Sequence, residues 1–193
     1  MKVSREKMAE NRTRILEEAG RLFREKGFEA VSVSEVMKAA GLTHGGFYGH
    51  FASKDDLIAE SLSHMIATSL GNSRDFDRFA DGYLSDAHRA KASTGCPTAA
   101  LASETAHRDP AARAAMTAGL KMQLDFLAGS VPAAQGSTAR REAIGRWSAM
   151  VGAVILARAC DDPVLASELL RETRAWIGRG SEITSHQSSK SSP

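Results

Sequence analysis

Aromatic residues, cysteines and long apolar runs are all scarce in this sequence of 193 residues. Phe, Trp and Tyr together make up only 6% of the chain. This argues against a β-sandwich, because strands favour aromatic and β-branched residues. The longest uninterrupted apolar run, residues 149–157, is far shorter than the roughly 20 residues that a membrane-spanning helix needs. We therefore expect an all-α protein without a membrane segment.

Cysteine is limited to Cys96 and Cys160, too few for a disulfide framework. The first residues, MKVSREKMAENRTR, contain basic side chains but lack the apolar stretch of a secretory signal. Both features are typical of a protein that stays in the reducing cytoplasm, and we expect a cytoplasmic location.

Recognisable catalytic and metal-binding motifs are also missing. The chain contains no phosphate-binding Walker loop, no HExxH and no paired CxxC. No spacing of Ser and His indicates a nucleophile with its base, and His44 and His50 lack a third ligand within range. We expect no enzyme activity, no cofactor and no metal.

Helical periodicity dominates what is present, and no segment predicts a strand. The pattern predicts about nine helices, over residues 5–26, 33–40, 44–50, 54 onward, 74–90, 97–107, 110–129, 138–159 and 163–178. Residues 130–137 are expected to form a loop. The Ser-rich residues 181–193 are expected to form a disordered tail.

The most informative segment is residues 32–54, SVSEVMKAAGLTHGGFYGHFASK. Two short predicted helices flank Gly41-Leu42-Thr43, which is the pattern of a helix-turn-helix. Ser32 is placed to cap the first helix, and Ser53 to cap the helix that follows the motif. Gly41 permits the positive φ that the tight turn requires.

These residues resemble the TetR family of transcriptional regulators. The resemblance lies in Gly27-Phe28, Val33, Val36, Ala40-Gly41-Leu42-Thr43, Tyr48, His50, Phe51, Ser53, Lys54 and Leu57. It implies an all-helical homodimer with an N-terminal three-helix domain that binds a double-stranded DNA operator. It also implies a larger helical domain for a small-molecule effector and for dimerisation. We place the DNA-binding domain at residues 1–53, the second domain at 54–180 and the tail at 181–193.

A recognition helix enters the major groove, while phosphate contacts fix its position. The resemblance implies phosphate contacts from Ser34, Tyr48, His50 and Lys54, and it places His44 and Gly45 at base edges. Phe51 is expected in the core. The predicted DNA-binding residues are Ser32, Ser34, Thr43, His44, Gly45, Gly46, Tyr48, His50 and Lys54.

The small net charge of +2 hides an uneven distribution. Residues 1–54 carry a net +3, whereas residues 55–193 carry a net −1. The excess includes Lys2, Arg5, Lys7, Arg12 and Arg14 at the N-terminus. An extension of this kind can reach phosphates or the minor groove, and the alternative is a solvated, frayed end.

A dimer is expected because one helix-turn-helix covers only one half-site. The last two predicted helices offer small and apolar residues for an isologous interface, whose alternative is packing within the chain. The predicted interface residues are Gly145, Ala149, Gly152, Ala153, Leu165, Leu169 and Trp176. The candidates for an effector pocket are Phe76, Phe79, Tyr83, Cys96, Met116, Leu120, Phe126 and Trp147, each of which could equally be ordinary core.

Together these features predict a ligand-responsive regulator, most plainly a repressor, that binds a palindromic operator as a homodimer and is released by a small effector. Gly95-Cys96-Pro97 places a thiol at a helix N-terminus, where the dipole can lower its pKa. A regulator that senses electrophiles or oxidants through Cys96 is therefore an alternative. A helical interaction protein without DNA binding is a further alternative, which leaves the motif unexplained.

Overall fold

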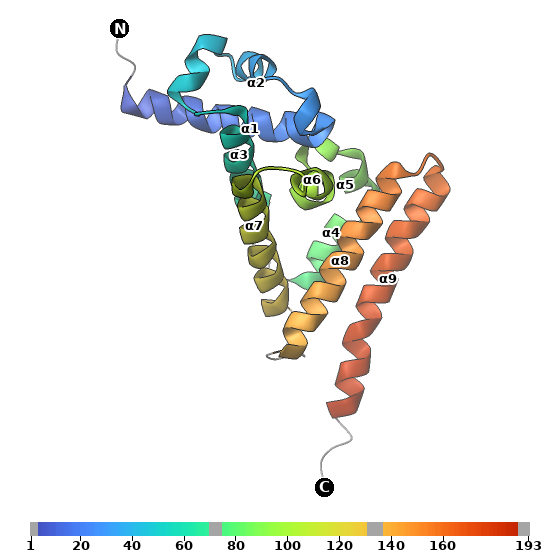
Figure 1. Cartoon of the computed structure of the whole chain (residues 1–193). Coiled ribbons are helices and arrows are strands. Elements are labelled where there is room, and N and C mark those ends of the chain that lie inside the picture. Colours follow the sequence, from blue (N-terminus) through green and yellow to red (C-terminus); the bar gives the residue numbers. More distant parts are fainter. Residues whose placement is uncertain (1–3, 70–74, 131–136, 189–193) are drawn as a thin grey trace. The chain divides into compact units, whose positions relative to one another are not determined.

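The computed structural model describes residues 4–69, 75–130 and 137–188, the last ten of these as backbone only. The described residues form nine α-helices and two 3₁₀ helices and contain no strand (Figure 1). The predicted all-α class is thus confirmed. Within the same ranges, no helix combines the length and apolarity needed to cross a membrane.

The chain divides into two compact units. The first comprises Met1–Leu70 and Ala92–Gly119, and the second comprises Gly71–Lys91 and Leu120–Pro193. Each unit is thus built from two segments that are distant in the sequence. A division based on packing does not test where the DNA-binding function ends. The division of function after residue 53 stays a prediction.

The first unit contains α1 (Arg5–Ala30), α2 (Val33–Ala39), η1 (His44–Gly49), α3 (Lys54–Ser69), η2 (Ala92–Thr94), α6 (Pro97–Thr105) and the beginning of α7 (Pro110–Gly129). Its core consists of side chains that are at most 1% exposed, including Ile15, Phe23, Phe28, Val36, Phe47, Leu57 and Leu62. These residues come from α1, α2, η1 and α3, so one apolar core fixes all four elements.

Local capping chemistry sets several helix starts, as predicted. The Ser32 Oγ accepts a hydrogen bond from the Glu35 amide at 3.1 Å, which caps α2. The Ser53 Oγ accepts from the Asp56 amide at 3.0 Å, and the Asp56 carboxylate in turn accepts from the Ala52 amide at 2.9 Å. This reciprocal pair starts α3.

Glycine conformations break the chain at two places in the first unit. Gly27 and Gly41, with φ values of +81° and +68°, are the positive-φ residues among the described ranges. The positive φ predicted for Gly41 in the turn is therefore confirmed. The regular part of α1 breaks at Gly27, as expected, but residues 28–30 form a further helical turn beyond it.

The second predicted helix of the motif forms a 3₁₀ helix, η1, and not an α-helix. Three of its six residues are Gly45, Gly46 and Gly49. Glycine has a low helix propensity because it loses the most backbone entropy. A short 3₁₀ segment is therefore a physically reasonable outcome here.

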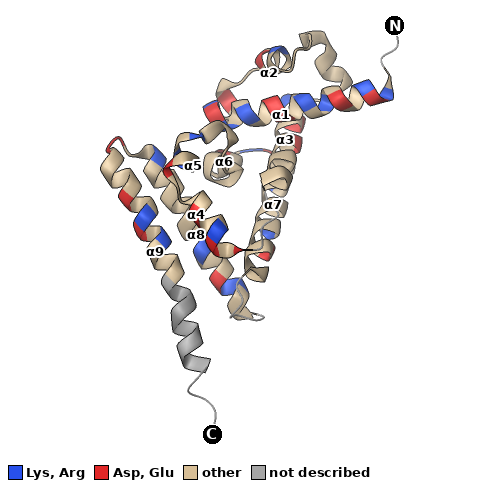
Figure 2. Cartoon of the chain, turned by 180° about the vertical axis from the view of Figure 1, so that it is seen from behind, with Lys and Arg blue, Asp and Glu red and all other residues tan. Residues whose placement is uncertain are grey.

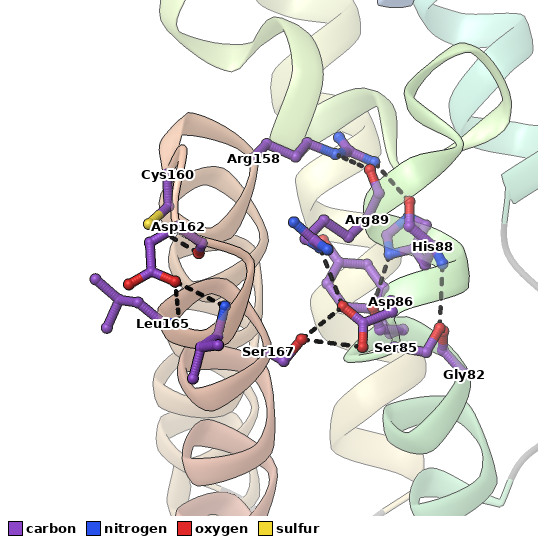
Figure 3. Close-up of polar contacts among 12 residues, drawn as sticks. Gly82, Ser85, Asp86, His88, Arg89, Arg158, Cys160, Asp162, Leu165 and Ser167 are labelled. Atoms are coloured by element: carbon purple, nitrogen blue, oxygen red, sulfur yellow. Dashed lines mark hydrogen bonds and ion pairs between the residues drawn. The ribbon is translucent and has the colours of Figure 1, made fainter.

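In the second unit, the prediction of a single helix over residues 74–90 is wrong. The chain forms α4 (Phe76–Tyr83) and α5 (Asp86–Ala90), and residue 74 lies outside the described residues. Leu84, with φ −91° and ψ +48°, leaves the helical region. The Ser85 Oγ accepts from the His88 amide at 3.1 Å and donates to the Gly82 carbonyl at 2.8 Å (Figure 3). A serine that can satisfy backbone groups in this way competes with helix continuation.

The second unit is completed by the end of α7, by α8 (Ser137–Ala159) and by α9 (Pro163–Ser188). α8 and α9 lie side by side (Figure 1). α9 continues past the predicted end at residue 178, so the predicted disordered tail, residues 181–193, begins inside a helix. Residues 179–188 contain no proline, the residue that interrupts a helix most strongly. Residues 189–193, and 131–136 of the predicted loop, lie outside the described residues.

Candidate nucleic-acid interface

The helix-turn-helix is held by backbone hydrogen bonds across its turn. The Leu42 amide donates to the Met37 carbonyl at 2.8 Å, and the Gly41 amide donates to the Lys38 carbonyl at 3.0 Å. Val36 and Phe47 are buried on the two sides of the turn. The angle between α2 and η1 therefore depends on a tight turn closed by apolar packing.

The aromatic residues of η1 and its end divide sharply between inside and outside. Phe47 is 1% exposed and Phe51 is 2% exposed, and their rings stack with centroids 5.8 Å apart. Tyr48, between them in sequence, is 73% exposed. A large aromatic side chain held at a domain surface by a buried neighbour is available to a partner. The prediction that Phe51 belongs to the core is confirmed.

Most of the predicted DNA-binding residues lie on the surface of α2 and η1. The exposed members of the set are Ser32, Ser34, Thr43, His44, Gly45, Gly46 and Tyr48, whereas His50 and Lys54 are half-buried. Thr43 occupies the N-cap position of η1 but makes no side-chain capping hydrogen bond. The Thr43 hydroxyl therefore does not cap η1.

The two half-buried residues are partly engaged by the protein. The Lys54 ammonium donates to the Glu29 carbonyl at a long distance of 3.5 Å. Burial, together with the nearby Arg12 cation, lowers the pKa of His50 below its ordinary value. Both effects favour the neutral imidazole in the protein without DNA.

The basic N-terminal residues are not all available for phosphates. Arg12 forms an ion pair with Glu60, and its guanidinium lies 4.8 Å from the ring centroid of Phe51. Arg14 donates to the Ala40 carbonyl at the end of α2. These two arginines hold the helix-turn-helix against α1 and α3, which corrects the expectation that they extend toward DNA.

The remaining charges of α1 are mixed in sign (Figure 2). Lys7 pairs with Glu10 at 2.8 Å, and Arg21 pairs with Glu18 and Glu25 at 2.9 and 3.1 Å. Ion pairs of this exposed kind contribute little to stability. Arg5 and Lys7 are exposed, and Lys2 lies outside the described residues.

A second set of contacts joins α6 to the end of α1, and sequence reasoning missed it. The Glu104 carboxylate accepts from the Phe28 amide at 2.7 Å, directly after the break at Gly27. Arg108, just beyond α6, pairs with Glu29 at 2.7 Å and lies 5.4 Å from the Phe28 ring centroid. The backbone break in α1 is thus stabilised by side chains about 80 positions further along the chain.

The predicted effector residues divide between the two units. Cys96 and Met116 belong to the first unit, and both are buried. Leu120 belongs to the second unit. The other members, Phe76, Phe79, Tyr83, Phe126 and Trp147, also belong to the second unit, where the last four form one cluster of rings. Four of the predicted residues thus form one ring cluster, and the effector-pocket role of the whole set stays a prediction.

The predicted dimer residues lie mostly at the surface of α8 and α9. Gly145, Leu165 and Trp176 are exposed, the last two by 44% and 61%. Ala149, Gly152 and Leu169 are half-buried, whereas Ala153 is only 5% exposed and packs within its own chain. Further large apolar side chains are exposed on the same two helices, namely Ile144, Ile155, Leu156 and Val164.

In the part of the chain that the structure describes, no three His, Cys, Asp or Glu side chains are arranged to hold a metal ion. The described residues instead present a helix-turn-helix whose surface is built from small polar groups, glycines and one exposed tyrosine. This arrangement defines the class of helix-turn-helix proteins.

Comparison with known proteins shows similarity in the helix-turn-helix segment. Residues 15–61 match the sequence model of the family described as "Bacterial regulatory proteins, tetR family". The HTH-type transcriptional regulator AcrR of Shigella flexneri is 42% identical over 57 residues, which are 30% of this chain and 26% of that protein. The HTH-type transcriptional repressor KstR2 of Rhodococcus jostii is 36% identical over 64 residues, which are 33% of this chain and 31% of that protein. Residues 15–61 of this chain therefore carry the sequence pattern of the TetR family.

The likeness beyond this segment is one of fold. A crystal structure of a TetR-family transcriptional regulator from Agrobacterium tumefaciens superposes with a TM-score of 0.70 at 22% identity, covering 89% of this chain and 98% of that one. The chain spans less than a third of the length of the two curated relatives named above. Sequence identity therefore concentrates in the helix-turn-helix, whereas the fold likeness covers both units.

Proposed function

We propose that this chain is a DNA-binding transcriptional repressor that binds a palindromic operator as a homodimer in the cytoplasm and is released by a small-molecule effector. The observation that carries the proposal is the surface of η1. Tyr48 is 73% exposed beside the buried Phe47, and the polar residues that precede it are exposed as well. Such a surface fits phosphate contacts on either side of a groove.

Glycines limit direct base recognition by η1. Gly45 and Gly46 supply backbone but no side chain at the positions expected to face base edges. His44 and Thr43 are therefore the main side chains available there. We therefore propose that part of the operator preference comes from DNA shape. The free energy needed to deform a duplex depends on its sequence, so a protein can prefer one sequence without contacting its bases.

Dimerisation is supported by the exposed apolar side chains of α8 and α9. Leu156, Val164 and Trp176 are 57%, 75% and 61% exposed. Exposed apolar groups gathered on one pair of helices are typical of a subunit interface. A twofold axis through such a face makes an isologous interface, which matches the symmetry of a palindrome.

Repression has one further support, since the Rhodococcus relative is named a repressor. Sensing through Cys96 receives less support than release by a bound effector. Cys96 is only 7% exposed. Reactive cysteines are commonly accessible to their oxidants, whereas buried ones are commonly structural.

The proposal is tested by fluorescence anisotropy with the DNA that flanks the chain's own gene and with random DNA of equal length. We expect preferential binding of the flanking DNA. If each protomer makes two cationic phosphate contacts, log K should fall with log salt with a slope of about −4. Failure to bind either duplex at low salt would contradict the proposal.

The proposed interface is tested by Trp176→Glu. A charge placed on each side of an isologous interface is buried and faces its own copy, so we expect dissociation to monomers in sedimentation velocity. The matched control is Met122→Glu, which alters a 47% exposed apolar residue of α7. The control should sediment as wild type. A dimeric Trp176→Glu variant would exclude this face.

A further inference from the structure

Four aromatic rings of the second unit form a continuous cluster. Phe79 and Tyr83 of α4 meet Trp147 of α8 with ring centroids 6.4 and 5.3 Å apart. Phe126 of α7 meets Phe79 edge-on at 5.7 Å. Three helices thus converge on one set of ring faces. Such a set can pack as core or receive a flat molecule against its exposed side.

The polar edge of Trp147 distinguishes this cluster from ordinary core. Trp147 is 5% exposed, and its Nε1–H has no hydrogen-bond partner among the described residues. A buried indole N–H without a partner costs free energy, so buried tryptophans usually find an acceptor. The unmet donor points to a ligand atom that can accept a hydrogen bond.

One wall of the cluster is fixed by the contacts that surround α5 (Figure 3). Arg158 of α8 donates to the carbonyls of His88 and Arg89 at 3.0 and 3.2 Å, and Ser167 of α9 donates to Asp86 at 3.1 Å. The His88 ring lies 4.6 Å from the Tyr83 ring, and its Nδ1 is 2.7 Å from the Tyr83 carbonyl. These contacts hold the Tyr83 side of the cluster in place.

The opposite wall is less enclosed. Phe79 and Phe126 are half-buried, whereas Tyr83 and Trp147 are buried. A molecule approaching the cluster therefore meets the faces of Phe79 and Phe126 first. Phe79 in turn stacks on Trp147, so a partly exposed ring adjoins the residue that carries the unpaired donor.

The charged side chains carried by α4, α8 and α9 favour an uncharged ligand. The guanidinium of Arg146 lies 3.4 Å from the Glu142 carboxylate, and Arg174 pairs with Asp77 and Asp81 at 2.9 and 2.6 Å. These cations face carboxylates of their own chain. The donor offered to a ligand is the neutral N–H of Trp147.

We propose that the Phe79, Tyr83, Phe126 and Trp147 cluster binds a neutral, planar aromatic molecule whose carbonyl oxygen accepts a hydrogen bond from the Trp147 indole. The inference rests on the proposed function in one respect, since it assigns a ligand class to the effector of that regulator. The rings supply stacking and edge contacts, and the indole N–H selects for an acceptor on the ligand.

The test uses two aromatic ketones as probes, acetophenone with one ring and 2-acetylnaphthalene with two. Toluene is the control, because it has the aromatic ring but no oxygen that accepts a hydrogen bond. The full-length protein is labelled with ¹⁵N, and the two indole N–H cross-peaks are assigned with Trp147→Phe and Trp176→Phe. We expect a ketone to move the Trp147 indole proton downfield and to leave the Trp176 peak in place. Toluene should not produce this downfield shift.

Affinity provides the second readout. Trp147→Phe keeps an aromatic ring but removes the donor, so it should weaken ketone binding about fivefold, as for the loss of one neutral hydrogen bond. Trp176→Phe is the matched control and should bind as wild type. An unmoved Trp147 peak with both ketones, or equal ketone affinity in Trp147→Phe, would overturn the inference.

DNA binding separates this inference from the proposed function. If a ketone binds through Trp147 but leaves operator affinity unchanged, the site stands and its effector role is wrong. If the protein binds operator while neither ketone binds, the inference fails and the DNA-binding proposal stands.

Discussion

Replacing Gly27 by alanine is expected to destabilise the protein by about 4 kcal/mol. Gly27 adopts φ +81° and ψ 169°, a region that is essentially restricted to glycine and costs other residues about 1–3 kcal/mol. A Cβ at this position would lie 2.5 Å from the Glu104 Oε1. Displacing that carboxylate removes the acceptor of the buried Phe28 amide, which costs about 1–3 kcal/mol more. Urea unfolding followed by circular dichroism measures the total.

The matched control is Gly82→Ala. Gly82 lies inside α4 at a negative φ, and no described atom beyond its chain neighbours and its own helix backbone lies within 4 Å of an added Cβ. This control should leave stability within about 1 kcal/mol of wild type and on the stabilising side. A Gly27→Ala variant as stable as Gly82→Ala would show that the break in α1 is not strained.

A double-mutant cycle identifies the source of the cost. If Glu104 contributes through the clash, then Gly27→Ala combined with Glu104→Ala should destabilise less than the sum of the single changes. Additive effects would assign the whole cost of Gly27→Ala to the backbone conformation and none to Glu104.

The second large effect is expected in DNA binding. Tyr48→Ala combined with Lys54→Ala should lower operator affinity about a thousandfold, because each protomer of a dimer loses one neutral and one charged phosphate contact. The salt slope should become shallower by about two, one cation per protomer. Fluorescence anisotropy over a salt series measures both quantities.

Stability should change little in that double variant, since Tyr48 is exposed and the Lys54 hydrogen bond is long. The control for lost charge is Lys121→Ala, an exposed lysine of α7. Tyr48→Phe separates the hydroxyl from the ring. Operator affinity within about threefold of wild type in the Tyr48→Ala and Lys54→Ala variant would remove both residues from the proposed interface.

Features set by neighbouring residues were predictable from the sequence. Ser32 and Ser53 cap their helices, and Gly41 turns the motif with a positive φ, because each depends on atoms only a few positions away. The burial of Phe51 was predictable for another reason, the general tendency of Phe side chains to be buried. Local chemistry thus sufficed for the helix-turn-helix, the part of the chain that also matches the family.

Features set by distant partners were not predictable. Arg12 and Arg14 resembled a basic extension, yet their partners Glu60 and Ala40 are brought to them by the fold. Glu104 carried no signal for its bond to the Phe28 amide, 76 positions earlier. The break after Tyr83 was missed because the apolar spacing continued through a serine able to start a new helix.

The aromatic cluster was predictable in one part and not in the other. Helical spacing placed Phe79 and Tyr83 on one face of α4, and this was readable in the sequence. The meeting of that face with Phe126 and Trp147 depends on the packing of α4, α7 and α8. That the Trp147 N–H has no acceptor among the described residues can be established only from the three-dimensional structure.

The glycines of η1 also bear on how a regulator of this kind acquires new targets. Gly45 has an ordinary backbone conformation, and no described atom beyond its chain neighbours lies within 4 Å of an added Cβ. A side chain could therefore be introduced there by one codon change without disturbing the buried Phe47 and Phe51. Gene duplication followed by such a change would give a copy with a different operator preference and an unaltered fold. The sparse surface of η1 thus leaves the protein open to evolutionary and engineered retargeting.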